Sequence, residues 1–358
     1  MEDNVSADGA ERDLNWCRDA VGDVSRTFAL TVDLLEDPMA DHITVGYLLC
    51  RIADTIEDAD HLPASTQASL LRTLDAVLDE ADQTTIRTFS GDVERWMPRP
   101  STRNDDWRVV GAAPIIAATF GSFSASTRRA IRTPVREMVT GMADFADRNA
   151  HRPGIRIQTK AELEQYCHVA AGTVGTLITN LLDGDDVPVE RSRTMAETAE
   201  GFGRLLQLVN IAKDVRADFV EENNVYLPAE WLAEEGVDQD AVLEPENADE
   251  VARVIGRVVD LATGYLDDGQ EYLTAMPLHS GNTLAAWAVP YLLSVGTLRE
   301  LERRPDDALT EGGVKISREE VYSVLEVTAS MSRDEIPELR DVIRQEPFHT
   351  REGGKTGL

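Results

Sequence analysis

VGYLLCRIADTIEDAD, residues 45–60, shows the pattern on which the fold depends. Its apolar residues recur at spacings of three and four, which is the repeat of an α-helix. The same repeat continues along most of the chain, and no run alternates apolar and polar residues with the period of a strand. The sequence therefore predicts an all-α protein, a single-domain helical bundle around a central active-site cavity.

The expected helices are separated by segments rich in proline, glycine and aspartate, such as residues 97–106, 152–154 and 183–188. Helices are predicted near residues 11–36, 39–60, 64–82, 109–149 with a break, 160–183, 190–221, 247–275, 279–304 and 317–332. We expect a flexible N-terminus over residues 1–10, one helical domain over 11–332, and a loosely held polar tail over 333–358.

The composition excludes one class of function. The 358 residues include 35 basic and 65 acidic ones, a net charge of −30, so no broad basic surface is present to bind nucleic acid. The basic residues include only four lysines: Lys160, Lys213, Lys315 and Lys355. A lysine-poor, acidic surface favours a halophilic protein, because high salt screens the repulsion between like charges. An acid-rich mesophilic protein is the alternative.

Other features of the sequence bear on the cellular compartment. Cys17, Cys50 and Cys167 are widely spaced and odd in number, so they suggest no disulfide framework. The first residues carry no basic and apolar signal segment. The longest apolar stretch, Leu284–Leu298, contains Pro290 and is shorter than the ~20 residues of a membrane span. We expect a cytoplasmic protein, with peripheral contact at the inner face of the membrane left open.

The first stretch carries a polar stripe. Tyr47, Arg51, Asp54 and Asp58 are spaced by four, three and four residues, which places them within about 60° of one another around a helix. The second stretch, GFGRLLQLVNIAKDVRADF at residues 201–219, carries another polar stripe about 80° wide. This second stripe consists of Gln207, Asn210, Asp214 and Asp218.

Pairs of acidic residues four apart are common by chance in so acidic a chain, and most are solvated. These two pairs differ because they continue apolar runs, and Gln207 and Asn210 stand where leucines would be expected facing a core. Carboxylates on two helices suit Mg²⁺, which binds few carboxylates together with substrate phosphates. A di-iron centre is the alternative, but it needs Glu-x-x-His motifs, and the one match, Glu346 to His349, contains Pro347.

Five segments together resemble the squalene/phytoene synthase family of head-to-head isoprenyl diphosphate synthases. They are VSRTFAL at 24–30, YLLCRIADTIED at 47–58, EMVTGMADF at 137–145, QLVNIAKDVRAD at 207–218, and VYLP at 225–228. The resemblance runs from about Val24 to Met331 and implies the helical isoprenoid-synthase fold. EQYCHVAAGTVG, AAWAVPYLLSVGTL and GVKISREEV resemble squalene synthases in particular, whereas VYLP is more similar to phytoene synthases.

The resemblance implies roles for the residues of both stripes. Asp54, Asp58, Asp214 and Asp218 would hold Mg²⁺, or Mn²⁺ in its place, against the diphosphates of two farnesyl diphosphate molecules. Arg26, Arg51 and Lys213 would bind diphosphate as cations, Tyr47 would donate a hydrogen bond to it, and Gln207 and Asn210 would add polar contacts. Tyr166 would relay the proton that is lost when presqualene diphosphate forms. NADPH would then reduce this intermediate to squalene, with Lys315 and Asn210 near the cofactor.

Structural interpretations of these residues remain open. Arg51 could pair with a neighbouring acid, Tyr166 could be a core tyrosine, and Lys315 could be an ordinary surface lysine. His168 is read as a packing or supporting residue rather than a metal ligand.

The chain also departs from the family pattern. Ala217 stands where an acidic residue is usual, and Asn223 and Asn224 stand where an arginine is usual. The same condensation without reduction, giving phytoene or dehydrosqualene, is the alternative activity. A non-catalytic helical interaction subunit is a third interpretation, and the four intact aspartates argue against it.

Overall fold

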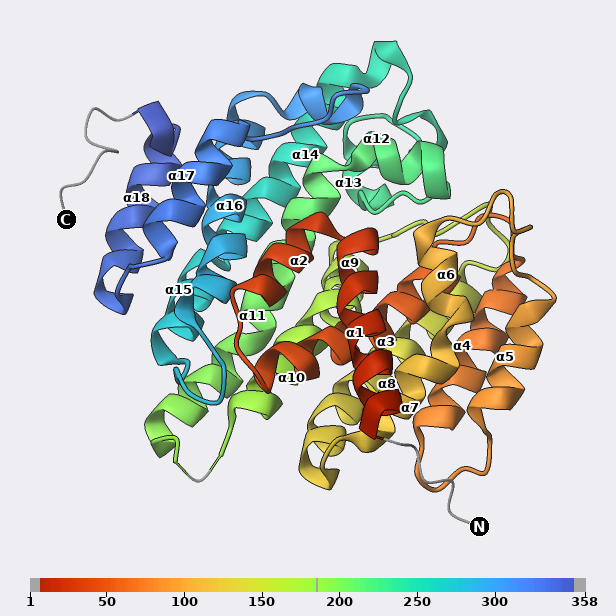
Figure 1. The fold of residues 1–358 in the computed structure, drawn as a ribbon. Coiled ribbons are helices and arrows are strands. Elements are labelled where there is room, and N and C mark those ends of the chain that lie inside the picture. The colour runs from red at the N-terminus through yellow and green to blue at the C-terminus, as the bar shows by residue number, and fades with distance from the viewer. Residues whose placement is uncertain (1–6, 185, 351–358) are drawn as a thin grey trace. The chain divides into compact units, whose positions relative to one another are not determined.

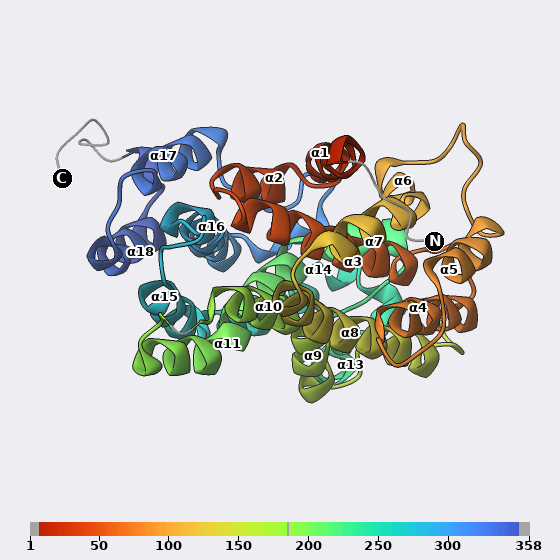
Figure 2. The same ribbon diagram turned by 60° about the horizontal axis from the view of Figure 1, so that its bottom comes forward.

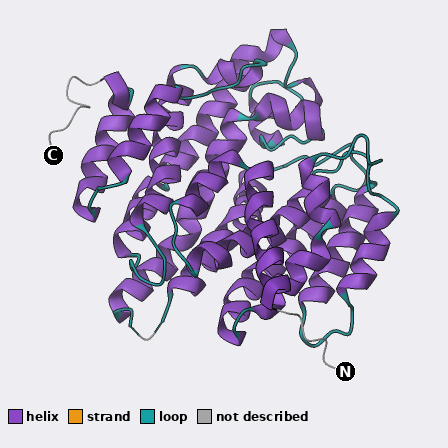
Figure 3. Ribbon diagram, viewed as in Figure 1, coloured by secondary structure: helices purple, strands orange, loops and turns teal. Residues whose placement is uncertain are grey.

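The structure is a computed structural model that describes residues 7–184 and 186–350. Within these ranges the chain forms helices joined by loops, without a strand (Figure 3). One isolated parallel bridge joins Arg156 and Val225. The predicted all-α class is confirmed. Among the described residues, no helix combines the length and the apolar character needed to cross a membrane.

The contacts of the described residues group into two compact units. The first unit contains the described residues up to His151 with Asn180–Leu182 and His279–Asn282, and the second contains the other described residues. The helices of the first unit are α1 (Ala7–Val24), α2 (Arg26–Asp33), α3 (Met39–Glu57), α4 (Ala64–Leu78), α5 (Ile86–Glu94), α6 (Asp105–Gly111), α7 (Ala113–Ser122) and α8 (Ala125–Arg148).

Helix α3 is the centre of the first unit. It packs against α8, α6, α1 and α7, and α4 packs along α8 (Figure 1). Most of α3 is buried, including Leu48, Ile52 and Ile56, which follow each other one turn apart. The burial of α3 agrees with the apolar spacing of this stretch in the sequence.

The second unit is built around α11. Its helices are α9 (Lys160–Cys167), α10 (Thr173–Leu182), α11 (Val189–Lys213), α12 (Val215–Ala217), α13 (Ala229–Glu234), α14 (Ala248–Thr263), α15 (Leu266–Ala275), α16 (Leu284–Arg303), α17 (Arg318–Thr328) and α18 (Ile336–Gln345), with π-helical turns η1 (His168–Gly172) and η2 (Asp218–Glu222) and the 3-10 turn η5 (Pro305–Leu309). Helix α11 packs against α15, α14, α16 and η1, and Figure 2 shows α15 lying beside it.

Glycines allow η1 and α10 to approach α11 at backbone distance. A Cβ atom on Gly175 would lie 2.1 Å from the carbonyl oxygen of Ala199, and one on Gly203 would lie 2.2 Å from that of Ala171. Only residues without a side chain fit such an approach. These close contacts hold the segment after Tyr166 against α11.

Several predicted boundaries are wrong. The helix predicted over 11–36 is divided by Ser25, whose side chain caps α2 by accepting a hydrogen bond from the Phe28 amide. Helices α5 and α13 form where only loops were expected, and α6 begins at Asp105, four residues before the predicted start at residue 109. Helices α5 and α13 are short, so the helical repeat had too few turns to be recognised.

The predicted tail also differs from the structure. Residues 333–345 are not loosely held, because η6 (Arg333–Glu335) and α18 follow α17 and α18 packs on α16. The apolar face of α18, which includes Ile336, Leu339 and Ile343, is buried. These apolar residues have helical spacing, but charged residues stand between them, so the apolar repeat is weak in the sequence. At the other end, Ala7–Ala10 belong to α1, while residues 1–6 and 351–358 of the predicted flexible segments lie outside the described residues.

Candidate functional site

The first acidic stripe lies on α3 and the residue that follows it. Tyr47, Arg51 and Asp54 belong to α3, and Asp58 is its C-cap, with its amide donating a 2.9 Å hydrogen bond to the Asp54 carbonyl. Helical backbone therefore continues to Asp58, and the predicted stripe is formed. All four side chains are half-buried, so they lie at the border of the core.

Arg51 has a partner that the sequence did not single out. Its Nε lies 2.8 Å and its Nη2 2.7 Å from Oδ1 of Asp106, in the first turn of α6. The interpretation in which Arg51 pairs with a neighbouring acid is therefore correct for this structure. Asp106 lies 55 residues away in sequence, and the first turn of α6 was expected as a loop, so local spacing could not identify it.

Electrostatics sets Asp54 apart from an ordinary surface carboxylate. Burial raises the pKa of Asp54 to about 6, with Arg51 opposing the shift and Asp106 adding to it. The charged form of a buried carboxylate is stabilised more by a nearby cation than the charged form of a solvated carboxylate is.

The SRTF segment, residues 25–28, supports the first stripe. Phe28 stacks on Tyr47 with ring centroids 4.0 Å apart and planes 15° from parallel. This contact fixes the ring of Tyr47, and burial raises the pKa of its hydroxyl. Arg26 follows the Ser25 cap and is exposed.

The second stripe is not carried by one uninterrupted helix, as the prediction had it. Helix α11 ends at Lys213, Asp214 is its C-cap, and Asp218 opens the π-helical turn η2 after the short α12. Hydrogen bonds from the Asp214 amide to the Asn210 carbonyl and from the Asp218 amide to the Asp214 carbonyl keep the spacing of one turn. The residues thus still follow one another along the segment.

The expectation that both amides face a core is wrong for Asn210. Asn210 is exposed, whereas Gln207 is half-buried. An apolar run in the sequence indicates that a helix is mostly buried. It does not show whether each polar residue within the run lies on the buried face.

Charges gather at the end of α11. The ammonium group of Lys213 contacts the carboxylate of Asp214. Burial raises the pKa of Asp218 to about 8, and the negative charges of Glu222 and Asp214 add to the shift. Two half-buried carboxylates favour a divalent cation at this place, whereas the ammonium group of Lys213 is suited to bind an anion such as a phosphate.

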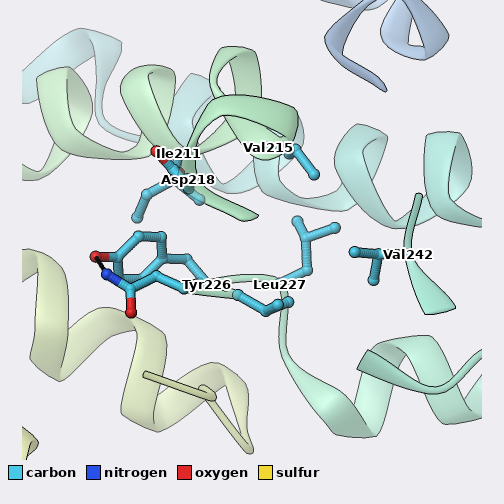
Figure 4. A pocket seen from close by; sticks show the side chains of 8 residues that line it. Ile211, Val215, Asp218, Tyr226, Leu227 and Val242 are labelled. Atoms are coloured by element: carbon cyan, nitrogen blue, oxygen red, sulfur yellow. Dashed lines mark hydrogen bonds between the residues drawn. The ribbon is translucent and has the colours of Figure 1, made fainter. Parts of the chain in front are cut away.

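Asp218 lines a small pocket in the second unit. The pocket is otherwise lined by Ile211, Val215, Asn224, Val225, Tyr226, Leu227 and Val242 (Figure 4). Tyr226 and Asn224 were not among the predicted site residues, although both lie in or next to the VYLP segment.

Tyr166 is linked to this pocket through Tyr226. The Tyr166 hydroxyl donates to the Tyr226 hydroxyl at 3.0 Å, and the two rings lie 4.6 Å apart between centroids. Tyr166 is buried and its hydroxyl has a partner, as expected for a core tyrosine. The predicted role as a proton relay is compatible with the same position.

The segment around Asn223 is held by residues 154–157. Buried Arg156 donates from Nη2 to the Asn223 side-chain oxygen at 2.9 Å and to Asp240 at 3.0 Å. Asn223 adopts a left-handed conformation with φ of 58°, and a Cβ atom on Gly154 would lie 2.0 Å from its carbonyl oxygen. Asn223 and Asn224, which stand where the resemblance leads us to expect an arginine, are therefore part of a turn that is held by these contacts.

His168 has a supporting contact. Its Nδ1 lies 3.0 Å from Glu200 on α11, and Glu200 also pairs with Arg204. The ring thus ties η1, which begins two residues after Tyr166, to α11. Single π-helical turns of this kind are frequent at functional sites.

Lys315 lies exposed in the segment after η5. Gly313, two residues earlier, has a φ of +59°, and a Cβ atom there would lie 3.6 Å from the Lys213 carbonyl oxygen. The segment that carries Lys315 therefore passes close to the end of α11, where the second stripe lies.

The donor set fits Mg²⁺. No cluster of three histidine, cysteine, aspartate or glutamate side chains that could hold a metal ion occurs among the residues described. Mg²⁺ is commonly bound through one or two carboxylates, with phosphate and water oxygens as its other ligands. Asp54 and Asp58, and separately Asp214 and Asp218, supply carboxylates of this kind, and burial disfavours the charge of Asp54 and Asp218 until a cation is present.

The comparisons with known proteins assign the family. The sequence model of the squalene/phytoene synthase family matches residues 21–320, so the chain belongs to this family. It is 25% identical over 319 residues to lycopaoctaene synthase of Botryococcus braunii, covering 88% of this chain and 66% of that protein. It is 24% identical to squalene synthase of Schizosaccharomyces pombe, covering 88% of this chain and 65% of that protein. The chain thus spans about two thirds of the length of these relatives.

Solved structures show the same fold. TcSQS in complex with the ligand E5700 matches with a TM-score of 0.75 and 21% identity over 94% of this chain and 98% of that chain. A dehydrosqualene synthase matches with a TM-score of 0.63 and 21% identity over 95% of this chain and 99% of that chain. The helical fold expected from the resemblance is confirmed.

Proposed function

We propose that this enzyme joins two farnesyl diphosphate molecules head to head, through presqualene diphosphate, and reduces the intermediate with NADPH to squalene. The observation that carries the proposal is that each aspartate pair has a cation beside it, Arg51 next to Asp54 and Lys213 next to Asp214. Relatives named squalene synthase, in Schizosaccharomyces pombe and in human, support the choice of product.

The residues have distinct tasks in this reaction. Mg²⁺ supplies positive charge that stabilises the departing diphosphate, and Asp54, Asp58, Asp214 and Asp218 would hold it. Guanidinium and ammonium groups bind diphosphate oxygens by charge-assisted hydrogen bonds, which is the task of Arg26, Arg51 and Lys213. Tyr47 donates to a phosphate oxygen, while Gln207 and Asn210 add polar contacts.

Two further tasks complete the proposal. Tyr166 relays the proton that is lost when the cyclopropane ring of presqualene diphosphate closes, and the released diphosphate is the final acceptor of that proton. Asn210 and Lys315 contact NADPH, and the passage of the Lys315 segment near the Lys213 carbonyl supports this assignment. A lysine is suited to bind the phosphates of a nicotinamide cofactor as a point charge.

The same condensation without reduction is the second candidate. It would give dehydrosqualene from farnesyl diphosphate or phytoene from geranylgeranyl diphosphate. The structural match to a dehydrosqualene synthase and the VYLP segment favour it.

One incubation separates the two candidates. The protein is mixed with Mg²⁺ and labelled farnesyl diphosphate in molar KCl, with and without NADPH, and the lipid extract is analysed by mass. High salt is chosen because the net charge is −30 and salt screens the resulting repulsion. Squalene that forms only with NADPH is the expected result. Dehydrosqualene whether or not NADPH is added, or phytoene from geranylgeranyl diphosphate alone, would establish the second candidate instead.

A further inference from the structure

Tyr166 and Tyr226 form a buried pair of hydroxyls. Their side chains are 4% and 6% exposed, and the Tyr166 O–H donates to the Tyr226 oxygen at 3.0 Å. Tyr226 belongs to the VYLP segment and lines the same pocket as Asp218 (Figure 4). The sequence resemblance gave a role to Tyr166 and none to Tyr226.

The direction of the hydrogen bond between Asn224 and Tyr226 follows from a backbone group. The Ile155 amide, which can only donate, binds the side-chain oxygen of Asn224 at 2.8 Å. The side-chain nitrogen of Asn224 therefore points the other way, and it donates to the Tyr226 oxygen at 3.1 Å. Tyr226 accepts from Asn224 and from Tyr166, which uses the two lone pairs of its oxygen.

The scaffold behind Tyr226 is rigid. The Val225 amide donates to the Ile155 carbonyl at 2.9 Å, and the Ile157 amide donates to the Val225 carbonyl at 3.1 Å. Arg156, between them, is buried and binds Asn223. Tyr226 is thus held by backbone pairing on a segment that does not include Tyr166.

We propose that Tyr226 is a positioning residue, which holds the hydroxyl hydrogen of Tyr166 toward itself so that the Tyr166 oxygen acts as an acceptor toward the substrate. A phenol whose own hydrogen is bound by a neighbour can meet a further partner only through a lone pair. An acid or base in a reaction must present the correct atom within hydrogen-bond reach. This inference rests on the proposed function, in which the substrate proton passes by way of this lone pair of Tyr166 to the released diphosphate, so that Tyr166 is a neutral phenol before and after the step.

The test is a double-mutant cycle on presqualene diphosphate formation from farnesyl diphosphate. Tyr226→Phe removes one oxygen atom and keeps the ring, and we expect kcat to fall about 10- to 100-fold while KM changes less than about twofold. In a Tyr166→Phe background, Tyr226→Phe has no further effect, because it acts through Tyr166. A full-activity Tyr226→Phe variant, or a fall of equal size in both backgrounds, overturns the inference.

Tyr272→Phe is the matched control. Tyr272 is fully buried and its hydroxyl lies 3.0 Å from that of Thr179, so this change also removes a buried phenol oxygen in the second unit. We expect kcat of Tyr272→Phe to stay within about twofold of wild type. Replacement of Tyr226 by 3-fluorotyrosine keeps the hydroxyl and is expected to retain most of the activity, which separates the loss of the hydroxyl from any loss of folding.

A spectroscopic readout does not depend on turnover. With 3-fluorotyrosine at position 166, the ¹⁹F resonance is expected to move in Tyr226→Phe and to stay in place in Tyr272→Phe. An unchanged resonance in Tyr226→Phe overturns the inference. Wild-type protein that converts neither farnesyl nor geranylgeranyl diphosphate overturns the proposed function and this role with it, whereas an active wild type with an equally active Tyr226→Phe variant overturns the role of Tyr226 alone.

Discussion

Arg51 binds Asp106 through two of its nitrogens, with Nε at 2.8 Å and Nη2 at 2.7 Å from the same carboxylate oxygen. The pair is half-buried, and Asp106 also raises the pKa of Asp54. A negative charge next to Arg51 opposes the binding of any anion there. We therefore expect Asp106→Asn to tighten the binding of inorganic diphosphate with Mg²⁺ by about three- to tenfold, measured by calorimetry.

Asp105→Asn is the control for this variant. Asp105 is exposed, pairs with Arg108 at 2.6 Å, and carries the same charge one residue away. Its removal is expected to change diphosphate affinity less than about twofold. Weaker binding by Asp106→Asn would mean that Asp106 orients Arg51 for diphosphate instead of competing with it.

The aspartates of both stripes are expected to be essential. Asp54→Asn or Asp214→Asn keeps the shape of the side chain and removes the charge that holds Mg²⁺, so we expect at least a ~100-fold loss of kcat for condensation. Product formation from labelled farnesyl diphosphate measures this, and Glu326→Gln, an exposed acid of α17, serves as the control. Unchanged turnover in Asp54→Asn would favour a non-catalytic interaction protein.

The part of the site that could be predicted is the part carried by single helical stretches. The spacing of Tyr47, Arg51 and Asp54 is set by one helix, and α3 was identified from its apolar repeat. Asp106 and Tyr226 could not be found in this way, because each meets its partner across a tertiary contact. Helical spacing contains no information about such pairs.

The fold shows the same division. Long helices such as α8 and α16 were located because their apolar repeat spans many turns. The tail helix α18 was missed, although Ile336, Leu339 and Ile343 have helical spacing, because its ten residues give the repeat fewer than three turns. The break at Asp214 was missed because no proline or glycine marks it.

Lys315 is expected to affect reduction and not condensation. Lys315→Gln removes one positive charge from the expected NADPH contact, and loss of such a charge-assisted hydrogen bond raises KM for NADPH by about tenfold or more. Steady-state rates at varied NADPH measure this, while presqualene diphosphate formation without NADPH stays unchanged. Lys160→Gln is the control, since Lys160 is exposed and pairs with Glu164. Equal effects of the two substitutions would argue against a cofactor contact at Lys315.

Two glycines allow a test of the close approach to α11. Gly175→Ala places a Cβ atom 2.1 Å from the Ala199 carbonyl oxygen, so the helices must separate and we expect a loss of at least about 1–3 kcal/mol in the free energy of unfolding. Gly256→Ala lies within α14, where none of the described atoms comes within 4 Å of the new Cβ. We expect it to stabilise the protein by about 0.5–1 kcal/mol. Urea unfolding compares the two, and a neutral Gly175→Ala would contradict the packing described here.

The pairing of Arg299 with Glu320 is expected to dominate the stability of the C-terminal helices. Both side chains are at most 2% exposed, and the guanidinium binds both carboxylate oxygens at 2.8 Å and the Ile343 carbonyl at 2.7 Å. Arg299→Met leaves the charge of Glu320 buried without its main partner, which costs about 3–5 kcal/mol. Arg253→Met, which breaks exposed pairs with Glu235 and Glu250, costs no more than about 1 kcal/mol.

Adding Glu320→Gln to Arg299→Met distinguishes an unpaired charge from lost packing. The double variant removes the buried charge, so it is expected to recover much of the stability that Arg299→Met loses. The Phe348 amide, which donates to Glu320 at 3.1 Å, still finds an oxygen acceptor on glutamine. Urea unfolding of the single and double variants measures this difference. A double variant no more stable than Arg299→Met would show that the aliphatic and hydrogen-bonding contacts of Arg299 with α18, and not its charge, hold these helices together.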